Sequence, residues 1–261
     1  GGAYDGKIVE RNAAGEEVRP LDISITKNVL GLFINSAVLL VILMSCVRWY
    51  KKHPLEDGAP KGGVGMIEAT VLSIYNDVIK GCIGENYRRY APYLLTAFFF
   101  VLVNNLMGLI PIFPGGANVT GNIAITLVLA LCTFVLTNVY GTKAYWKEIF
   151  WPDVPTWLKA PIPMMPLIEF FGIFTKPFAL MIRLFANIMA GHAAVLSLVA
   201  IIFITVKSGP VINGSMTVVS VAFSIFMNAL EILVAFIQAY VFTMLSAVFI
   251  GLSQVKEHAE K

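Results

Sequence analysis

A long apolar run that contains a single arginine constrains the fold of this chain most strongly. From Met164 to Val206 the sequence is apolar with no cluster of turn residues, and Arg183 lies inside this run. As one α-helix the run would be about 65 Å long, twice the ~30 Å hydrocarbon thickness of a bilayer. An arginine at the centre of a spanning helix costs about 2.5–3.5 kcal/mol, so an unpaired one indicates a function. The run therefore predicts a membrane helix with a functional cation at Arg183.

The composition of the whole chain indicates the same class of protein. Hydrophobic residues make up 57% of the sequence and charged residues only 13%, and the mean hydropathy is +0.77. About a quarter of the residues are charged in soluble domains. The net charge of +3 is modest and the basic residues lie at the ends of apolar segments, so nucleic acid is not an expected partner. We predict an all-α polytopic membrane protein with about five membrane-embedded helices.

The other apolar segments predict the remaining membrane helices. A first span is expected at 27–48, and the basic and aromatic residues after it place that end in the cytoplasm. The polar N-terminal arm, residues 1–26, is then expected outside. Residues 64–84 mix apolar and charged residues at helical spacing, which predicts an amphipathic helix on the membrane surface. Two further spans are expected at 90–110 and 121–141.

Two long helices are expected at the C-terminal end of the chain. The run 164–206 fits either two short spans with a tight turn or one kinked helix far from the bilayer normal. We favour the single helix, because nothing between Phe178 and His192 resembles a turn. After a Gly- and Pro-containing break at 207–214, a second overlong run occupies 215–253. Two such helices predict a tilted hairpin, and five crossings bring the charged C-terminal tail to the cytoplasm.

Polar residues on the two long helices form a predicted seam. Asn187 lies four residues after Arg183 and shares its face, whereas His192 lies on nearly the opposite side. Glu231 and Gln238 are two turns apart on the second helix and also share a face. Arginine is a permanent cation, whereas histidine gains and loses a proton near neutral pH. The seam is typical of a proton path with a fixed electrostatic barrier and a titratable relay.

Several other polar residues extend this seam or lie near it. Glu169 and Lys176 precede Arg183 at seven-residue intervals, although Pro177 interrupts the helical phase. Both lie close enough to the interface that snorkelling explains them equally well. The remaining candidates for channel lining are Asn104, Asn105 and Asn228. Asn104 and Asn105 could instead be polar packing residues, and we favour lining.

Structural explanations stay open for the central residues. Arg183 could form a buried ion pair with Glu231, and His192 could make an interhelical hydrogen bond. Asn187 and Gln238 could simply hold two helices together. The sequence has no catalytic triad, no phosphate-binding glycine loop and no metal-ligand spacing. We therefore expect no cofactor, no metal and no bond-making catalysis.

Three stretches of the chain resemble one known family. PFALMIRLFANIMAGH and ALEILVAFIQAYVFTMLSAVFI are similar to the two signature helices of subunit a of F-type ATP synthases of the bacterial type. PYLLTAFFFVLVNNLMGLIPIFPGGANVTGNIAITLVLAL resembles the middle membrane segments of the family. The resemblance covers the chain from Leu30 to Gln254.

This resemblance implies a non-catalytic stator subunit of the proton channel. Such a subunit presents its two tilted helices to a rotating ring of c subunits, each with one membrane carboxylate. Arg183 matches the family's essential arginine, which holds a ring carboxylate deprotonated and separates two proton half-channels. Asn187 and Gln238 match the polar residues beside it, and Glu169 matches a carboxylate near one half-channel.

The match also assigns an inlet, with two departures. His192 and Glu231 match the acid and histidine of the inlet, but some bacterial members carry the acid on the first helix and the histidine on the second. Here the two residues are exchanged. Gly108 stands where certain relatives have an aspartate in the LMxLIP motif, so Asn104 or Asn105 is expected to take its place.

The resemblance further implies partners and a location. The partners are the c-subunit ring, the b-type peripheral stalk subunits, the remaining ATP synthase subunits and membrane lipid. The location is the bacterial plasma (inner) membrane, with the N-terminus outside and the C-terminus cytoplasmic. Because His192 can relay protons, we expect a proton rather than a sodium ion as cargo. The alternatives are a structural membrane scaffold or a secondary ion transporter, and the internal repeat typical of transporters is not found in the sequence.

Overall fold

The computed structural model describes residues 10–11, 17–18, 26–53, 60–110, 119–150 and 164–254. Most of the predicted N-terminal arm, the loop 151–163 and the charged tail 255–261 lie outside these ranges. A short antiparallel pairing joins β1 (Glu10–Arg11) to β2 (Glu17–Val18), and the other described elements are helices. Four helical stretches of the described chain are long and apolar enough to cross a membrane, or five if one bent pair counts as a span. The predicted all-α polytopic class is confirmed.

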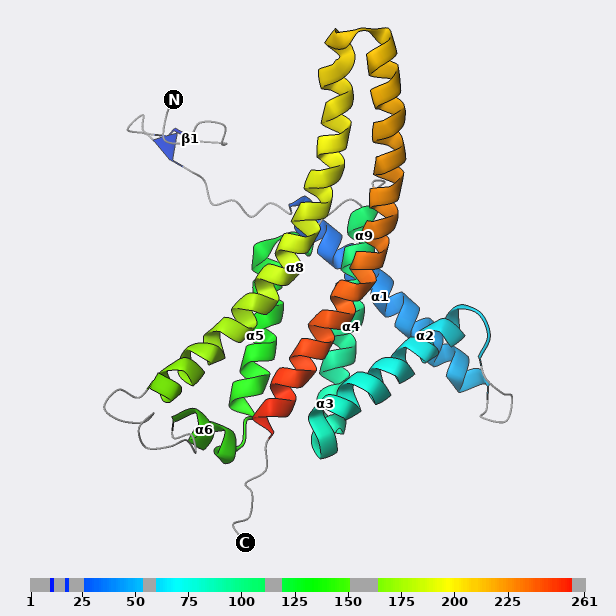
Figure 1. Cartoon of the computed structure of the whole chain (residues 1–261). Helices are drawn as coiled ribbons and strands as arrows, with labels where there is room; N and C mark the ends of the chain where they lie inside the picture. Colours follow the sequence, from blue (N-terminus) through cyan, green and yellow to red (C-terminus); the bar gives the residue numbers. More distant parts are fainter. Residues whose placement is uncertain are drawn as a thin grey trace.

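The first helix lies at the side of the bundle (Figure 1). Helix α1 (Lys27–Lys52) buries only Gly31, Asn35 and Leu39, which are four residues apart and form one stripe. This stripe packs against α4 (Tyr87–Leu109). The rest of α1 exposes large apolar side chains, as expected for a helix surrounded by lipid.

The predicted amphipathic segment is helical, and its π-helical part packs apolar side chains inside the protein. It consists of α2 (Gly63–Ser73), a π-helical segment η2 (Ile74–Lys80), α3 (Gly81–Ile83) and a 3-10 turn η3 (Gly84–Asn86). Ile74, Val78 and Ile79 are buried, whereas Asp77 and Lys80 are exposed. Gly84 has φ +74°, which glycine adopts without steric cost and which lets the chain turn back into α4. The position of this helix on the membrane surface stays a prediction.

The middle of the chain supplies two antiparallel neighbours of the long helices. Helix α4 contains Pro92, and α5 (Ile123–Val139) begins after Asn122, whose side chain accepts a hydrogen bond from the Ala124 N–H at 3.0 Å. A short helix, α6 (Lys143–Phe150), follows α5 at an angle of 97°. Helix α5 packs against the lower half of the long helix α8 (Met164–Thr205). Helix α4 packs against the last long helix, α9 (Pro210–Ser253) (Figure 1).

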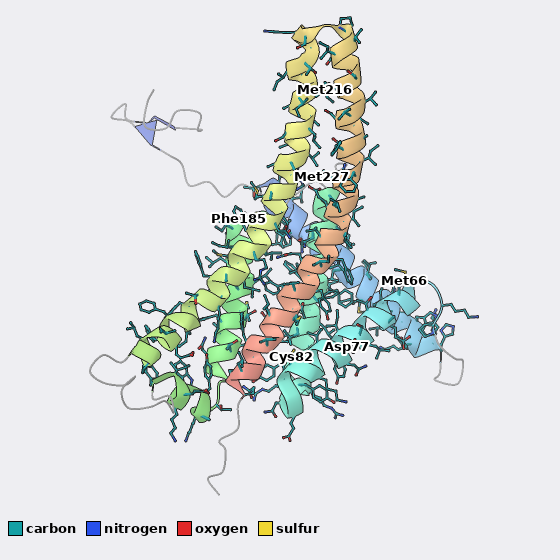
Figure 2. All side chains as sticks on the ribbon, in the orientation of Figure 1. Met66, Asp77, Cys82, Phe185, Met216 and Met227 are labelled. Carbon is teal, nitrogen blue, oxygen red and sulfur yellow. The ribbon has the colours of Figure 1, made fainter. Side chains whose placement is uncertain are left out.

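The C-terminal part of the chain is a hairpin of two very long helices. Helix α8 (Met164–Thr205) is continuous through Pro177, which confirms the prediction of one helix instead of two spans. After η4 (Val206–Ser208) and Gly209, α9 (Pro210–Ser253) begins five residues earlier than predicted. The physical reason is that proline is favourable at the first position of a helix. The upper halves of α8 and α9 stand clear of the bundle, and their side chains project outward (Figures 1 and 2).

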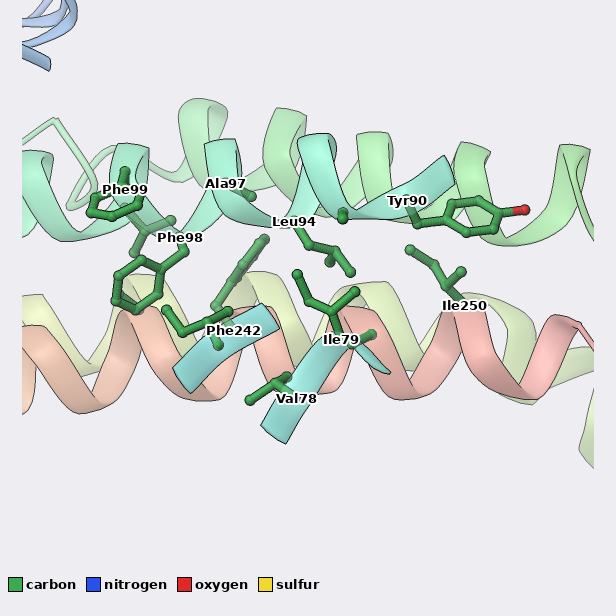
Figure 3. Packing of buried hydrophobic residues seen from close by; sticks show 14 of the residues in the cluster. Val78, Ile79, Tyr90, Leu94, Ala97, Phe98, Phe99, Phe242 and Ile250 are labelled. Atoms are coloured by element: carbon green, nitrogen blue, oxygen red, sulfur yellow. The ribbon is translucent and has the colours of Figure 1, made fainter. Parts of the chain in front are cut away.

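The core joins α4, η2 and the lower half of α9 (Figure 3). Leu94, Phe98 and Ile79 are fully buried in it, together with Ile250 of α9. Helix α9 also approaches α3 closely at Gly251, where an added Cβ would overlap the carbonyl oxygen of Cys82 and lie 3.0 Å from its carbon. A residue without a side chain is therefore required at this contact.

The C-terminal end of α9 is joined by hydrogen bonds to the connection between α5 and α6. The Thr142 N–H donates to the Ser253 carbonyl at 2.9 Å, and the Gln254 side chain donates to the Tyr140 carbonyl at 2.7 Å. The Arg89 guanidinium lies 4.5 Å from the centre of the Tyr140 ring. Because the last carbonyls of a helix have no partner within it, these contacts stabilise the end of α9.

Candidate functional site

The predicted polar seam is joined by a hydrogen bond between the two long helices. The Asn187 Nδ2 of α8 donates to the Gln238 Oε1 of α9 at 3.1 Å. Gln238 is buried, with 4% of its surface exposed, whereas Asn187 is exposed. The bond joins α8 to α9, and hydrogen bonds between polar side chains of this kind are typical contacts between membrane helices.

A cavity of about 30 Å³ lies between α4, α8 and α9. It is lined by Asn105, Gly108, Leu109, Asn187, Ile188, Gly191, His192, Glu231, Val234, Ala235 and Gln238. A buried water needs a polar cavity of roughly 10–15 Å³ or more, so this one has room for water. The tertiary structure thus brings four of the predicted seam residues to one cavity, together with one asparagine of a third helix.

The acid of the predicted inlet pair rests against the backbone of the opposite helix. A Cβ added to Gly191 would overlap the Oε1 of Glu231 and lie 3.1 Å from its Cδ. His192 follows Gly191 and lies within electrostatic range of the Glu231 carboxylate. Within the described residues the buried Oε1 of Glu231 has no hydrogen-bond partner. Such a carboxyl group is stable when it is neutral or in contact with water.

Arg183 lies outside this cavity. It is exposed, whereas Leu180 and Leu184 on the same helix are buried against the bundle. In the described part of the chain it makes no hydrogen bond and no ion pair, so the alternative of a buried pair with Glu231 does not occur there. An exposed cation on an apolar membrane helix is available to a group from another molecule.

The two adjacent asparagines of α4 point to different neighbours. The Asn105 Nδ2 donates to the Ala235 carbonyl of α9 at 3.3 Å, and Asn105 lines the cavity beside Gly108. Asn104 instead accepts a hydrogen bond from the Asn35 Nδ2 of α1 at 2.9 Å. Of the two residues offered as lining, only Asn105 borders the cavity, and Asn104 is a packing residue between α1 and α4.

A second and smaller cavity, of about 10 Å³, lies where α5, α6 and α8 meet. Lys176 lines it together with Asn138 and Tyr145, and the Tyr145 hydroxyl donates to the Asn138 Oδ1 at 3.5 Å. Glu169 lies within electrostatic range of Tyr145. Glu169 and Lys176, which were predicted to extend the polar seam, are thus grouped at this end of α8.

Two predictions about residues need comment. Asn228 is exposed on α9 and borders neither cavity. Gly191 was not predicted as a site residue, although a glycine in an apolar membrane helix is a known signal for close approach of another group.

Comparison with known proteins identifies the family. Residues 30–251 match the family model of the ATP synthase A chain. The chain belongs to this family. It is 47% identical to the ATP synthase subunit a of Chlorobium phaeobacteroides over 98% of its own length and 75% of the relative. It is 44% identical to the ATP synthase subunit a of Chloroherpeton thalassium, over 92% of this chain and 70% of the relative. It is 40% identical to that of Myxococcus xanthus, over 91% of this chain and 75% of the relative.

Membership of the ATP synthase A chain family fits the helices described above. The relatives are bacterial subunits named as parts of ATP synthase, and this chain has four to five helices that could cross a membrane. The chain is therefore a membrane component of a multi-subunit ATP synthase, and a bacterial inner membrane fits it.

Proposed function

We propose that this subunit forms two proton half-channels and passes protons to and from the carboxylates of a c-subunit ring, which couples proton flow to rotation and ATP synthesis. The subunit itself is non-catalytic. One observation carries the proposal: Glu231 and His192 border a cavity between α4, α8 and α9, while Arg183 is exposed on α8 without a partner in the described chain. A titratable pair and a separate fixed cation are the parts that a proton path with a barrier needs.

Arg183 serves as the barrier between the half-channels. A cation that faces a carboxylate in a medium of low dielectric favours the ionised form of the acid. A ring carboxylate that arrives protonated must therefore release its proton before it passes Arg183. Because Arg183 is not committed to an acid in the described chain, it can meet a succession of moving carboxylates.

The cavity between α4, α8 and α9 serves as the inlet. His192 and Glu231 take up and release the proton, and Asn105 supplies an amide from the third side. The Asn187–Gln238 bond holds α8 and α9 together between this pair and Arg183. Exchange of the acid and the histidine between the helices leaves them on the same cavity, so the relay keeps its members.

The cavity around Lys176 and Tyr145, with Glu169 nearby, serves the other half-channel. In Figure 1 the tip of the hairpin lies at the opposite end of the molecule from α3, α6 and the end of α9. We infer that the tip faces outward and the other end faces the cytoplasm, with the N-terminus outside. The exposed apolar faces of α8 and α9 meet the c ring, and b-type stalk subunits and lipid cover other faces.

The proposal is tested by ATP-driven acidification of vesicles that contain the complete synthase, with and without sodium. We expect the wild type to acidify the lumen without sodium and Arg183→Ala to abolish acidification while the complex remains assembled. Arg48→Ala is a matched control, because Arg48 is an exposed cation at the end of α1. Normal pumping by Arg183→Ala would favour the structural scaffold, and acidification by the subunit without ATP or a ring would favour the secondary transporter.

A further inference from the structure

Helix α1 is attached to the rest of the protein through a narrow contact with a polar centre. Its buried stripe consists of Gly31, Asn35 and Leu39, and the next residues, Leu40 and Val41, are exposed. Asn35 is only 1% exposed. Burial of an amide among apolar groups is unfavourable unless the amide is hydrogen-bonded, so Asn35 needs a specific partner.

The partner is the side chain of Asn104. The Asn35 Nδ2 donates to the Asn104 Oδ1 at 2.9 Å, and the Asn104 Nδ2 donates to the Phe100 carbonyl of its own helix at 2.8 Å. Among the described residues this is the only side-chain hydrogen bond between α1 and α4. It therefore ties the Asn104 side of α4 to α1, in addition to the core contacts that α4 makes through Leu94 and Phe98.

The next residue of α4 faces the proposed inlet. Successive residues of an α-helix are about 100° apart around its axis, so Asn104 and Asn105 reach different neighbours. Asn105 donates to the Ala235 carbonyl of α9 and lines the cavity that contains Glu231. Two adjacent amides thus hold α4 at one depth between α1 on one side and α9 on the other.

We propose that Asn35 is a positioning residue for the inlet: through Asn104 it fixes the rotation of α4 and keeps the Asn105 amide directed at the cavity. This inference rests on the proposed function. Without the Asn35 donor, the Asn104 oxygen is left unpaired in an apolar contact, which favours rotation of α4. Asn105 turns with the helix, and its contact with the cavity and with Ala235 is lost.

The test is a double-mutant cycle in vesicles that contain the complete synthase. ATP-driven acidification is measured for Asn35→Leu, for Asn105→Leu and for the variant with both substitutions, with the amount of subunit in the complex as a second measurement. We expect Asn35→Leu to lower the pumping rate by about threefold or more at normal incorporation. In the Asn105→Leu background the same change should have no further effect, because its route of action is already removed.

Controls separate positioning from simple helix packing. Ser45→Leu makes the same kind of change at an exposed residue of α1 and should pump normally. Asn35→Asp should pump within about twofold of the wild type, because a buried carboxylic acid stays neutral and still donates a hydrogen bond. If the Asn35→Leu subunit is not incorporated into the complex, the variant with both Asn35→Leu and Asn104→Leu is tested instead, because it leaves neither of the two amides unpaired. Slow pumping by this double variant supports the proposal.

Three outcomes would overturn this inference. The first is a wild-type pumping rate in Asn35→Leu, or in the variant with both Asn35→Leu and Asn104→Leu. The second is a double variant of Asn35→Leu and Asn105→Leu whose loss of pumping rate is the product of the two single losses. The third is an Asn35→Asp pumping rate as low as that of Asn35→Leu. Arg183→Ala in the same vesicles distinguishes the two proposals. If Arg183→Ala abolishes pumping while Asn35→Leu leaves it normal, the proposed function stands and only the role of Asn35 fails.

Discussion

At Gly191 the lack of a side chain decides where a buried acid can lie. The Glu231 side chain occupies the space that a Cβ at this position would fill. Its carboxyl group is thereby held against α8 next to His192, although the two residues are far apart in the sequence. The acid–histidine pair therefore depends on a third residue that has no polar group of its own.

Gly191→Ala should lower the pumping rate strongly. The new methyl group overlaps the Glu231 carboxyl group, and overpacking of this kind costs about 1–3 kcal/mol or displaces the side chain. ATP-driven acidification and the amount of incorporated subunit are measured together. Gly172→Ala is the control, because a Cβ there meets nothing within 4 Å. Partial recovery on adding the shorter Glu231→Asp is expected, and an unchanged rate in Gly191→Ala would refute this packing.

Exchange of the inlet pair should be tolerated better than loss of either member. His192→Glu and Glu231→His place two like groups together, whereas the double variant restores one acid and one histidine at the same cavity. We expect the double variant to pump at least about threefold faster than either single variant, since neighbouring residues are not additive. The readout is the initial rate of acidification, and a double variant slower than both singles would contradict the pairing.

At the level of elements, close approach explains how α9 reaches both the core and the inlet. Gly251 lets α9 approach the Cys82 carbonyl of α3, and Thr142 holds the carbonyl of Ser253 at its C-terminal end. Higher on the same helix, Gln238 binds α8. Helix α9 is therefore fixed at two levels, and its upper half extends from a well-packed base.

Gly251→Ala should destabilise the subunit without touching the inlet. The Cβ would overlap backbone atoms, which cannot move as freely as the end of a side chain, and the expected cost is about 1–3 kcal/mol. The measurement is the temperature at which the detergent-solubilised subunit loses its folded, protease-resistant form. Gly81→Ala, in the adjacent α3, has free space and should melt like the wild type. Equal melting temperatures of Gly251→Ala and Gly81→Ala would show that the contact between α3 and α9 has room for a methyl group.

At the level of the whole molecule, the described elements separate into two ends. The hairpin tip around Gly209 forms one end, whereas α3, α6 and the end of α9 form the other (Figure 1). Basic residues such as Arg89 and Lys143 lie at the second end, and cationic loops face the cytoplasm in most membrane proteins. The arrangement agrees with an outward-facing hairpin tip.

Labelling of single cysteines tests this orientation. In a variant without Cys46, Cys82 and Cys132, Ser208→Cys at the tip should react with a membrane-impermeant maleimide added to the outside of intact cells. Lys143→Cys should react only after the cytoplasmic side is opened, and it serves as the matched comparison. Reaction of Lys143→Cys in intact cells with protection of Ser208→Cys would reverse the proposed orientation.

The sequence by itself determined the membrane class and the approximate ranges of the helices, because apolar length and helical periodicity are local properties. The polar seam was predicted from the same periodicity. It also indicated that Arg183 and His192 lie on opposite sides of α8, which agrees with one being exposed and the other lining the cavity. The tertiary structure decided which residues of different helices meet. Only packing shows that Asn105 borders the cavity, that Asn104 binds Asn35, and that Gly191 accommodates Glu231. These contacts depend on how closely distant helices approach one another, which no periodicity within a single helix specifies.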